Sequence, residues 1–306
     1  MQKILITGAK GQIGSELYPL LQKTIDPANI FTLDLAEDHS HNYFQASVTE
    51  PEKLEEVISQ NQITHIYHLA AILSAIGERN PKLAWEVNMQ GLLNVLECAK
   101  KFHCQVFWPS SIAAFGPNTP KAAPQHTVME PTTMYGITKK TGEDLCHYYY
   151  RTYGVDVRSV RFPGILSYKT PPGGGTSDFA VAVFYEGLQH HKYESFVQGR
   201  TQIPLMYIDD ALQAMISIMS APVDAIKIRT SYNISGLSCT FDDLIAEINK
   251  HLQVQVTFNP DFRQQIADSW PDALIDEEAQ NDWGWQPNFD LSATTLAMLT
   301  GLKEII

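Results

Sequence analysis

Ile4-Leu5-Ile6-Thr7-Gly8-Ala9-Lys10-Gly11-Gln12-Ile13-Gly14 is the stretch of this 306-residue sequence that decides its fold. A short apolar run leads into a G-x-x-G-x-x-G turn, and a helical pattern follows. Glycines at these spacings allow a tight turn, close approach of backbone N–H groups to a pyrophosphate, and close packing of helix on strand. Free N–H groups at the start of the helix favour a bound anion. The stretch therefore predicts a strand, a turn and a helix that bind a dinucleotide.

Asp34 lies 20 residues beyond Gly14, at the end of a second apolar run that begins at Ile30. A carboxylate there can accept hydrogen bonds from both hydroxyls of an adenosine ribose and would repel a 2′-phosphate. No arginine follows Asp34 to reverse this preference. The sequence thus predicts NAD rather than NADP, the alternative being that Asp34 only ends a strand.

Apolar runs alternate with helical patterns through the first half of the chain. The expected strands are residues 3–7, 30–35, 65–70, 105–110 and 155–162, and the expected helices are residues 12–23, 51–60, 81–101 and 135–153. This alternation predicts an α/β fold, with a Rossmann-type doubly wound parallel sheet covered on both faces. After residue 165 the pattern becomes irregular. We therefore expect residues 1–165 to form mainly the NAD-binding domain, and residues 166–306 mainly a smaller, mixed substrate-binding lobe with some segments returning to the sheet.

The composition is that of an ordinary soluble enzyme, with 44% hydrophobic and 18% charged residues. A formal net charge of -12 argues against nucleic-acid binding, which depends on a basic surface. No apolar run approaches the roughly 18 residues that span a bilayer, and the first residues show no signal-peptide pattern. The four cysteines form no C-x-x-C pair and no metal-ligand spacing with histidine. We expect a cytoplasmic protein that binds no nucleic acid, membrane or metal.

Tyr135 and Lys139 stand four residues apart in an expected helix, so their side chains share one face. A phenol has a pKa of about 10 and is a poor base at neutral pH, but a neighbouring ammonium favours the phenolate. Ser111 follows an expected strand, where it can hydrogen-bond a reacting oxygen near Tyr135. Such residues also occur on ordinary surface helices and at turns. Beside a dinucleotide, they predict alcohol oxidation in which Tyr135 takes the hydroxyl proton while hydride leaves the carbon.

The order of G-x-x-G-x-x-G, Ser110-Ser111 and Tyr135-x-x-x-Lys139 resembles the extended branch of the short-chain dehydrogenase/reductase family over essentially the whole chain. Supporting motifs are His68-Leu69-Ala70-Ala71, Asn88-x-x-Gly91 and Trp283-Gly284-Trp285-Gln286-Pro287. Residues 71–75, 109–113, 131–136 and 167–176 are similar to one subgroup, the NAD-dependent L-threonine 3-dehydrogenases.

The resemblance implies a set of cofactor contacts spread over the first 165 residues of the chain. They are Gly8, Gly11, Gln12, Ile13, Gly14, Asp34, Leu35, Ser47, Val48, Leu69, Ala70, Ala71, Asn88, Tyr135, Lys139, Pro163 and Ile165. Within this set, Asn88 would link its helix backbone to a water near Lys139. Ser47 departs from the family, which commonly has an acidic residue there, so the adenine contact is expected to be weaker.

The resemblance also implies a substrate pocket for L-threonine, with Ser111, Tyr135 and Lys139 as the catalytic residues. The pocket residues are Ser74, Ser111, Tyr135, Gly174, Thr176 and Trp270. Serine or threonine at a helix start can bind a carboxylate or simply cap the helix, and the alternative for Trp270 is a place in the core. The stretch Pro171-Pro172-Gly173-Gly174-Gly175 suggests a hinged lid that excludes water.

The expected reaction converts L-threonine and NAD to 2-amino-3-oxobutanoate and NADH without a metal. A nucleotide-sugar epimerase or dehydratase of the same family is the nearest alternative, although Arg161-Phe162-Pro163-Gly164-Ile165 lacks the asparagine common in those relatives. A catalytically silent NAD sensor is a third possibility. The family resemblance further implies a homodimer that pairs through helices 81–101 and 135–153, with Leu92, Val95 and Leu96 either at that interface or in the core.

Overall fold

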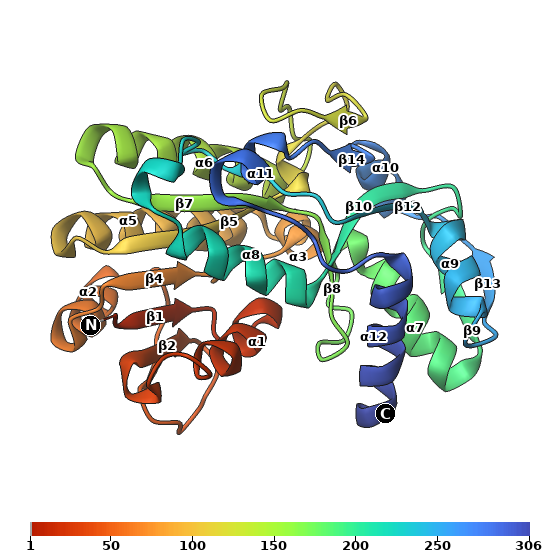
Figure 1. The fold of residues 1–306 in the computed structure, drawn as a ribbon, viewed down its shortest axis with the longest axis horizontal. Helices are drawn as coiled ribbons and strands as arrows, with labels where there is room; N and C mark the ends of the chain where they lie inside the picture. The colour runs from red at the N-terminus through yellow and green to blue at the C-terminus, as the bar shows by residue number, and fades with distance from the viewer. Residues whose placement is uncertain (1) are drawn as a thin grey trace.

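A seven-stranded parallel sheet dominates the computed structural model, which describes residues 2–306 (Figure 1). Its strand order is β11-β7-β5-β4-β1-β2-β3. These strands are β1 (Ile4–Thr7), β2 (Ile30–Asp34), β3 (Tyr43–Gln45), β4 (His65–His68), β5 (Gln105–Ser111), β7 (Val157–Phe162) and β11 (Tyr232–Asn233). The chain order reverses at β1, which pairs with β2 on one side and β4 on the other. The expected Rossmann-type sheet is confirmed, and ligands of such sheets bind where the order reverses.

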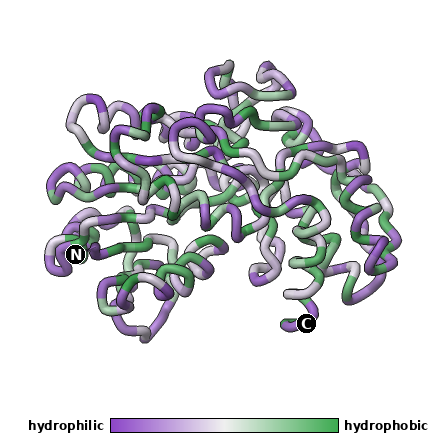
Figure 2. The backbone as a smooth tube through the Cα atoms, in the orientation of Figure 1, coloured by the Kyte–Doolittle hydropathy of each residue, from purple (hydrophilic) through white to green (hydrophobic). Residues whose placement is uncertain are grey.

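Successive residues of β1 enter two different hydrophobic cores, because neighbouring side chains of a strand point to opposite faces. Leu5 packs in a core with residues of α2 (Pro51–Asn61), α5 (Gly91–Phe102) and α6 (Met134–Tyr153). Ile4 and Ile6 belong to a second core that includes residues of α1 (Gln12–Leu21) and α8 (Ile208–Ser220). Figure 2 shows hydrophobic residues along β1 and along the neighbouring α1. Both faces of the sheet are thus covered.

The helix expected at residues 81–101 is interrupted. It consists of α4 (Pro81–Trp85), a π-helical turn at Glu86–Gln90, and α5. The interruption coincides with Asn88, whose side chain accepts a hydrogen bond from the Ile72 N–H (2.7 Å) and donates to the Ile72 carbonyl (3.0 Å). These bonds hold the loop after β4 against the helix. Periodicity alone does not reveal such a turn.

Leu92, Val95 and Leu96 are fully buried between α5 and its neighbours in the core, so they are not available to a dimer interface. The exposed apolar side chains of these helices are others, among them Trp85 and Tyr148, which are 48% and 49% exposed. Of the two readings that the sequence left open, the structure supports the core.

The smaller lobe is built mainly from residues after 163. A three-stranded sheet has the order β12-β10-β8, with β8 (Gly164–Leu166) parallel and β12 (Leu237–Thr240) antiparallel to β10 (Gln202–Tyr207). The strands β9 (Lys192–Ser195) and β13 (Gln255–Phe258) form a separate pair. The lobe helices are α7 (Phe179–His190), α9 (Phe241–Asn249), α10 (Phe262–Asp268), α11 (Glu277–Trp283) and α12 (Leu291–Ile305).

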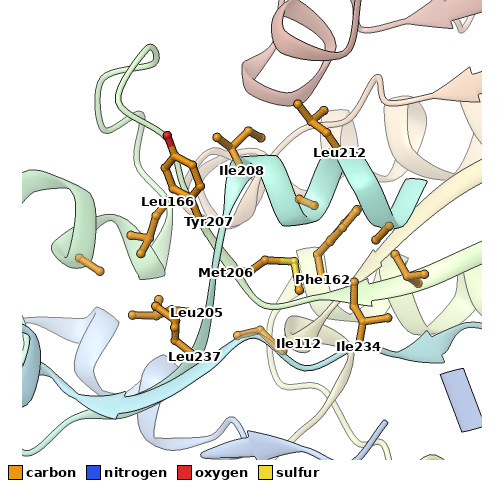
Figure 3. Close-up of a cluster of buried hydrophobic side chains, with 14 of the residues drawn as sticks. Ile112, Phe162, Leu166, Leu205, Met206, Tyr207, Ile208, Leu212, Ile234 and Leu237 are labelled. Carbon is orange, nitrogen blue, oxygen red and sulfur yellow. The ribbon is translucent and has the colours of Figure 1, made fainter. Parts of the chain in front are cut away.

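Several segments cross between the two halves. β11 completes the edge of the large sheet beside β7, and α8 packs on that sheet. In the other direction, β6 (Ala122–Ala123) pairs with β14 (Ala273–Leu274) of the lobe. Figure 3 shows the junction, where Phe162, Met206 and Ile234 lie together. The division at residue 165 stays a prediction, and strands of two or three residues such as β11 and β3 are too short to be recognised from their sequence.

Among residues 2–306, we find no helix whose length and apolar character would suit a membrane crossing.

Candidate active site

The turn after β1 brings backbone segments closer together than side chains would allow. Gly8 has φ +69°, and a Cβ atom there would lie 2.6 Å from the Ala70 nitrogen. A Cβ atom on Gly14 would lie 2.4 Å from the Gly8 carbonyl oxygen, so helix α1 packs directly on the turn. The N-cap residue Gly11 has no side chain to bond the first N–H groups of α1. The cradle therefore fits a pyrophosphate at the helix N-terminus.

Asp34 faces the same turn from the end of β2. Its carboxylate accepts hydrogen bonds from the N–H groups of Lys10 (2.8 Å) and Leu35 (2.7 Å). Both residues, with Asp34, line a cavity of about 310 Å³. The predicted cofactor residues that line this cavity are Gly8, Gly11, Asp34, Leu35, Ser47, Val48, Leu69, Ala70 and Ala71. The arrangement fits an adenosine ribose beside Asp34.

A second cavity, of about 170 Å³, continues along the carboxyl edge of the sheet and shares Leu69 and Ala71 with the first. The predicted residues that line it are Gln12, Ile13, Leu69, Ala71, Ser74, Ser111, Tyr135, Lys139, Pro163, Ile165, Thr176 and Trp270. The structure thus brings the three predicted catalytic residues together with most of the predicted substrate residues. We call this second cavity the reaction cavity.

Tyr135 lies in the first turn of α6, which begins where the Thr133 side chain accepts a hydrogen bond from the Gly136 N–H (3.0 Å). Its phenol is hydrogen-bonded to Ser111, the last residue of β5. Burial raises the pKa of Tyr135 to about 12, and the Ser111 hydrogen bond only partly offsets this rise. In the protein alone, the phenol is therefore protonated at neutral pH.

Lys139 is 3% exposed, and its Nζ donates a hydrogen bond to the Pro109 carbonyl at 2.6 Å. The ammonium lies 5.5 Å from the centroid of the Tyr135 ring. Burial lowers the pKa of Lys139 to about 7, while the nearby Glu143 acts in the opposite direction. In the protein alone, burial dominates the pKa of Tyr135, and the lowering expected from Lys139 is not observed.

A buried ion pair below this site was not anticipated from the sequence. Both oxygens of the Glu143 carboxylate accept hydrogen bonds from the Arg161 guanidinium, at 2.9 and 2.8 Å. Ser110 donates to the same carboxylate at 2.6 Å, and Arg161 also donates to the Asn233 side chain at 2.9 Å. This network joins α6 to β5, β7 and β11. The available signal in the sequence was that Glu143 lies four residues after Lys139, which places both side chains on the same face of the helix.

Three predicted residues do not line either cavity. Gly14 packs on the turn, as its role in helix packing requires. Asn88 uses its side chain on Ile72 and on the Thr138 hydroxyl (3.1 Å), so it positions the loop after β4 rather than facing the cofactor site. Gly174 donates its N–H to the Asp178 carboxylate at 2.7 Å, and its neighbour Gly175 lines the reaction cavity instead.

Ser74 and Thr176 begin helical turns, but neither is the capping residue. The N-cap positions of these turns are Leu73 and Gly175. Both hydroxyl-bearing residues are more than 90% buried, and both line the reaction cavity. Across residues 2–306, no hydrogen bond of either side-chain hydroxyl to the protein is present. They are therefore available to a bound molecule.

Asp178 lines the reaction cavity and was not among the predicted site residues. It is the single carboxylate among the described residues that line this cavity, where Lys139 is the single basic residue. Its Oδ2 accepts hydrogen bonds from the N–H groups of Gly174 (2.7 Å) and Gly175 (2.8 Å). The acidic residue at the end of Thr176-Ser177-Asp178 was visible in the sequence, but nothing indicated that it faces the cavity. The cavity therefore offers a negative charge near two free hydroxyls.

The fold, the glycine cradle and the Ser/Tyr/Lys cluster define a dinucleotide-dependent α/β enzyme of the short-chain dehydrogenase type. Residues 4–235 match the model of the NAD dependent epimerase/dehydratase family, and the chain belongs to that family. Its cofactor is NAD. No group of three or more His, Cys, Asp or Glu side chains suited to a metal ion occurs within the described part of the chain.

The chain is similar along its full length to proteins of several organisms. It is 40% identical over 314 residues to an uncharacterized epimerase/dehydratase of Staphylococcus haemolyticus, with 99% of this chain and 98% of the relative covered. The holo form of a GalE-like L-threonine dehydrogenase from Cupriavidus necator is 46% identical, has a TM-score of 0.96, and covers 98% of this chain and 99% of its own. The L-threonine dehydrogenase of Clostridium difficile is 42% identical, with a TM-score of 0.97 and coverages of 100% and 98%.

Proposed function

We propose that this protein oxidises the 3-hydroxyl of L-threonine with NAD, giving 2-amino-3-oxobutanoate and NADH. The observation that carries the proposal is Asp178, whose carboxylate borders the same cavity as Tyr135. An amino acid brings an ammonium group that a carboxylate attracts, and an alcohol brings the proton that a tyrosine can accept. The similarity to structures described as L-threonine dehydrogenases supports this assignment.

Each polar group of the reaction cavity has a role in this proposal. The Ser74 and Thr176 hydroxyls hold the substrate carboxylate, and Asp178 holds the ammonium. Trp270, which is 6% exposed, forms the apolar wall beside the methyl group. These contacts fix the 3-hydroxyl next to Tyr135, which replaces an encounter in solution with an oriented one.

Proton transfer follows from the geometry of the catalytic residues. Ser111 donates a hydrogen bond to the substrate oxygen and keeps it near Tyr135, whose phenolate form accepts the hydroxyl proton. Lys139, with the positive nicotinamide ring of the cofactor, would stabilise the phenolate, and its side chain would hold the cofactor ribose. Bound NAD would supply the acceptor for the hydride of the substrate carbon. Lys139 is buried and Tyr135 is partly buried, which strengthens the charge interactions between them.

A nucleotide-sugar epimerase or dehydratase is the alternative, since the family and the staphylococcal relative are described as epimerase/dehydratase. The reaction cavity has a volume of about 170 Å³. Pockets for drug-sized ligands are about 300–1,000 Å³. A cavity of this size favours a substrate with few heavy atoms over a nucleoside diphosphate sugar.

The decisive assay compares L-threonine with (R)-3-hydroxybutanoate, the same alcohol without the ammonium group. After exhaustive chelation, we expect NAD reduction with L-threonine and a kcat/KM lower by about tenfold or more with the hydroxy acid, because a hydrogen bond to a charged group contributes about 1.5–3 kcal/mol. Equal rates would remove Asp178 from substrate selection. No reduction with L-threonine, together with tight binding of a UDP- or dTDP-sugar in calorimetry, would favour the epimerase.

We also propose a homodimer in the cytoplasm, with the contact formed by the outer faces of α4 and α6. Trp85 and Tyr148 are about half exposed there, and Ile137 is 39% exposed. A similar structure, 44% identical, is described as a monomeric L-threonine 3-dehydrogenase, so the family resemblance alone does not decide this point. Light scattering of the purified protein tests the proposal, and a monomeric mass at micromolar concentration would refute it.

A further inference from the structure

Glu16 forms a direct link between the cofactor helix and the loop that leads to the substrate residues. It lies in α1, four residues after Gln12, which lines the reaction cavity. Its carboxylate accepts a hydrogen bond from the Ser167 hydroxyl and lies 3.1 Å from the Lys169 ammonium. The Glu16 side chain is only 4% exposed, although it belongs to a surface helix.

The two partners of Glu16 belong to the first residues of the loop between β8 and α7. Figure 1 shows this loop projecting between α1 and α12. Lys169 also donates its backbone N–H to the Ser167 hydroxyl at 3.2 Å, so the two residues form one anchored turn. Tyr168, between them, packs against Gly301 of α12, and its carbonyl accepts a hydrogen bond from Tyr185 at 2.5 Å. The start of the loop is thus fixed to both α1 and the smaller lobe.

The other end of the loop is fixed at the reaction cavity, where Asp178 holds the N–H groups of Gly174 and Gly175. Between these anchors, the described residues 170–173 have no hydrogen bond to the rest of the protein, and residues 171–173 are exposed. The loop is therefore a strap held at its two ends. One end is on the helix that receives the pyrophosphate, and the other carries the groups that contact the substrate.

A carboxylate removed from water is costly unless its charge is compensated. Here the compensation comes from Ser167 and Lys169, which are both in the strap, so any displacement of the strap away from α1 leaves Glu16 uncompensated. Lys169 itself is 48% exposed and is the less constrained partner. The free-energy cost of burying the Glu16 carboxylate therefore depends on the contact between the strap and α1.

We propose that Glu16 is a positioning residue that couples NAD binding at α1 to amino-acid binding at residues 174–178, an inference that rests on the function proposed above. NAD fixes the N-terminal turn of α1, and Glu16 fixes the strap to that helix. Coupling between two sites is reciprocal, so the amino acid tightens NAD binding by the same factor.

The test measures NAD affinity by calorimetry with and without saturating L-2-aminobutyrate, which is L-threonine without its hydroxyl and cannot be oxidised at C3. For the wild-type protein we expect NAD to bind about fivefold tighter or more in its presence, which is the lower end of typical coupling. In E16A the enhancement falls below about twofold, while the affinity for NAD alone changes by less than about twofold. E52A, which removes an exposed acid from α2, keeps the wild-type enhancement.

Kinetics give a second readout that a merely structural role would not produce. E16A raises the KM for L-threonine with little change in kcat. E16Q keeps an acceptor for Ser167, so its KM lies between those of E16A and the wild type. K169M removes only the half-exposed partner, so it gives a weakened enhancement in a folded protein even when E16A does not fold. Wild-type enhancement in both E16A and K169M, or its absence from a wild-type protein that oxidises L-threonine, overturns the inference. Failure to oxidise L-threonine overturns the proposed function instead.

Discussion

Replacing Lys139 with methionine should stabilise the protein while it lowers turnover by roughly a hundredfold or more. Lys139 is buried, and the Pro109 carbonyl is its single hydrogen-bond acceptor within residues 2–306. Burial holds its pKa at about 7, against an ordinary value of 10.5. In the unfolded chain, the amine is fully hydrated and binds a proton up to about pH 10. The folded state therefore carries a charge that it does not solvate well.

The size of this penalty follows from the pKa. A shift of one pKa unit corresponds to about 1.36 kcal/mol, so the lowering of the Lys139 pKa from 10.5 to about 7 amounts to about 5 kcal/mol. Methionine removes the charge but leaves the Pro109 carbonyl without its donor, which costs about 1–3 kcal/mol. We expect K139M to be more stable than the wild type by about 2–4 kcal/mol below pH 7. Since the folded pKa is lowered, the wild-type penalty declines as pH rises from about 7 towards 10.5, and the advantage of K139M declines with it.

Urea denaturation at pH 6, 8 and 10 measures this dependence, with NAD reduction assayed in parallel. K140M is the matched control, because Lys140 is the next residue of α6 and pairs with Asp144 at the surface. Its stability should change by less than about 1 kcal/mol, with no trend in pH. Turnover of K139M should fall by roughly a hundredfold or more. A K139M protein that is less stable than the wild type at pH 6, or a difference that does not vary with pH, would refute the reasoning.

Three further changes test the site. E143Q leaves Arg161 uncompensated in the core and should lower the free energy of unfolding by about 3–5 kcal/mol in urea titrations, and a loss below 1 kcal/mol would contradict the account of this pair. G14A places a methyl group 2.4 Å from a backbone oxygen and should weaken NAD binding in calorimetry by at least about tenfold, whereas G173A, which adds its methyl group in open space, should bind NAD as the wild type does. D34N should reduce the preference for NAD over NADP, measured as the ratio of kcat/KM values, because it removes the charge that repels a 2′-phosphate; an unchanged ratio would assign that preference to other residues.

The sequence was sufficient for the elements that depend on local pattern. The first strand, the glycine turn and α1 could be predicted because each glycine there answers a steric requirement, which Gly8 and Gly14 show directly. The closeness of the three catalytic candidates could also be predicted. Tyr135 and Lys139 occur at helical spacing, and Ser111 lies at the end of a parallel strand. Their catalytic roles remain predictions.

The remaining features depend on contacts between distant parts of the chain. Asp178 lines the reaction cavity with its carboxylate held by the N–H groups of Gly174 and Gly175, a loop geometry that residue types alone do not specify. The pairing of Glu143 with Arg161 requires α6 to lie over β7, and the π-helical turn at Asn88 depends on a loop 16 residues earlier in the chain. The effect of burial on Tyr135 and Lys139 also follows from tertiary structure, so residue spacing could not show that the phenol is protonated in the protein alone.

The pairing of β6 with β14 has a consequence for the order of folding. It joins residues 122–123 to residues 273–274, next to the segment that carries Trp270. Contacts of such long sequence separation form late, because the intervening chain loses entropy when the loop closes. During synthesis, most of the nucleotide half can fold while the chain is still growing, since its first six strands precede residue 163. The wall of the reaction cavity is completed only after residues 270–274 emerge, so a nascent protein acquires its cofactor site well before it acquires a chamber for the substrate.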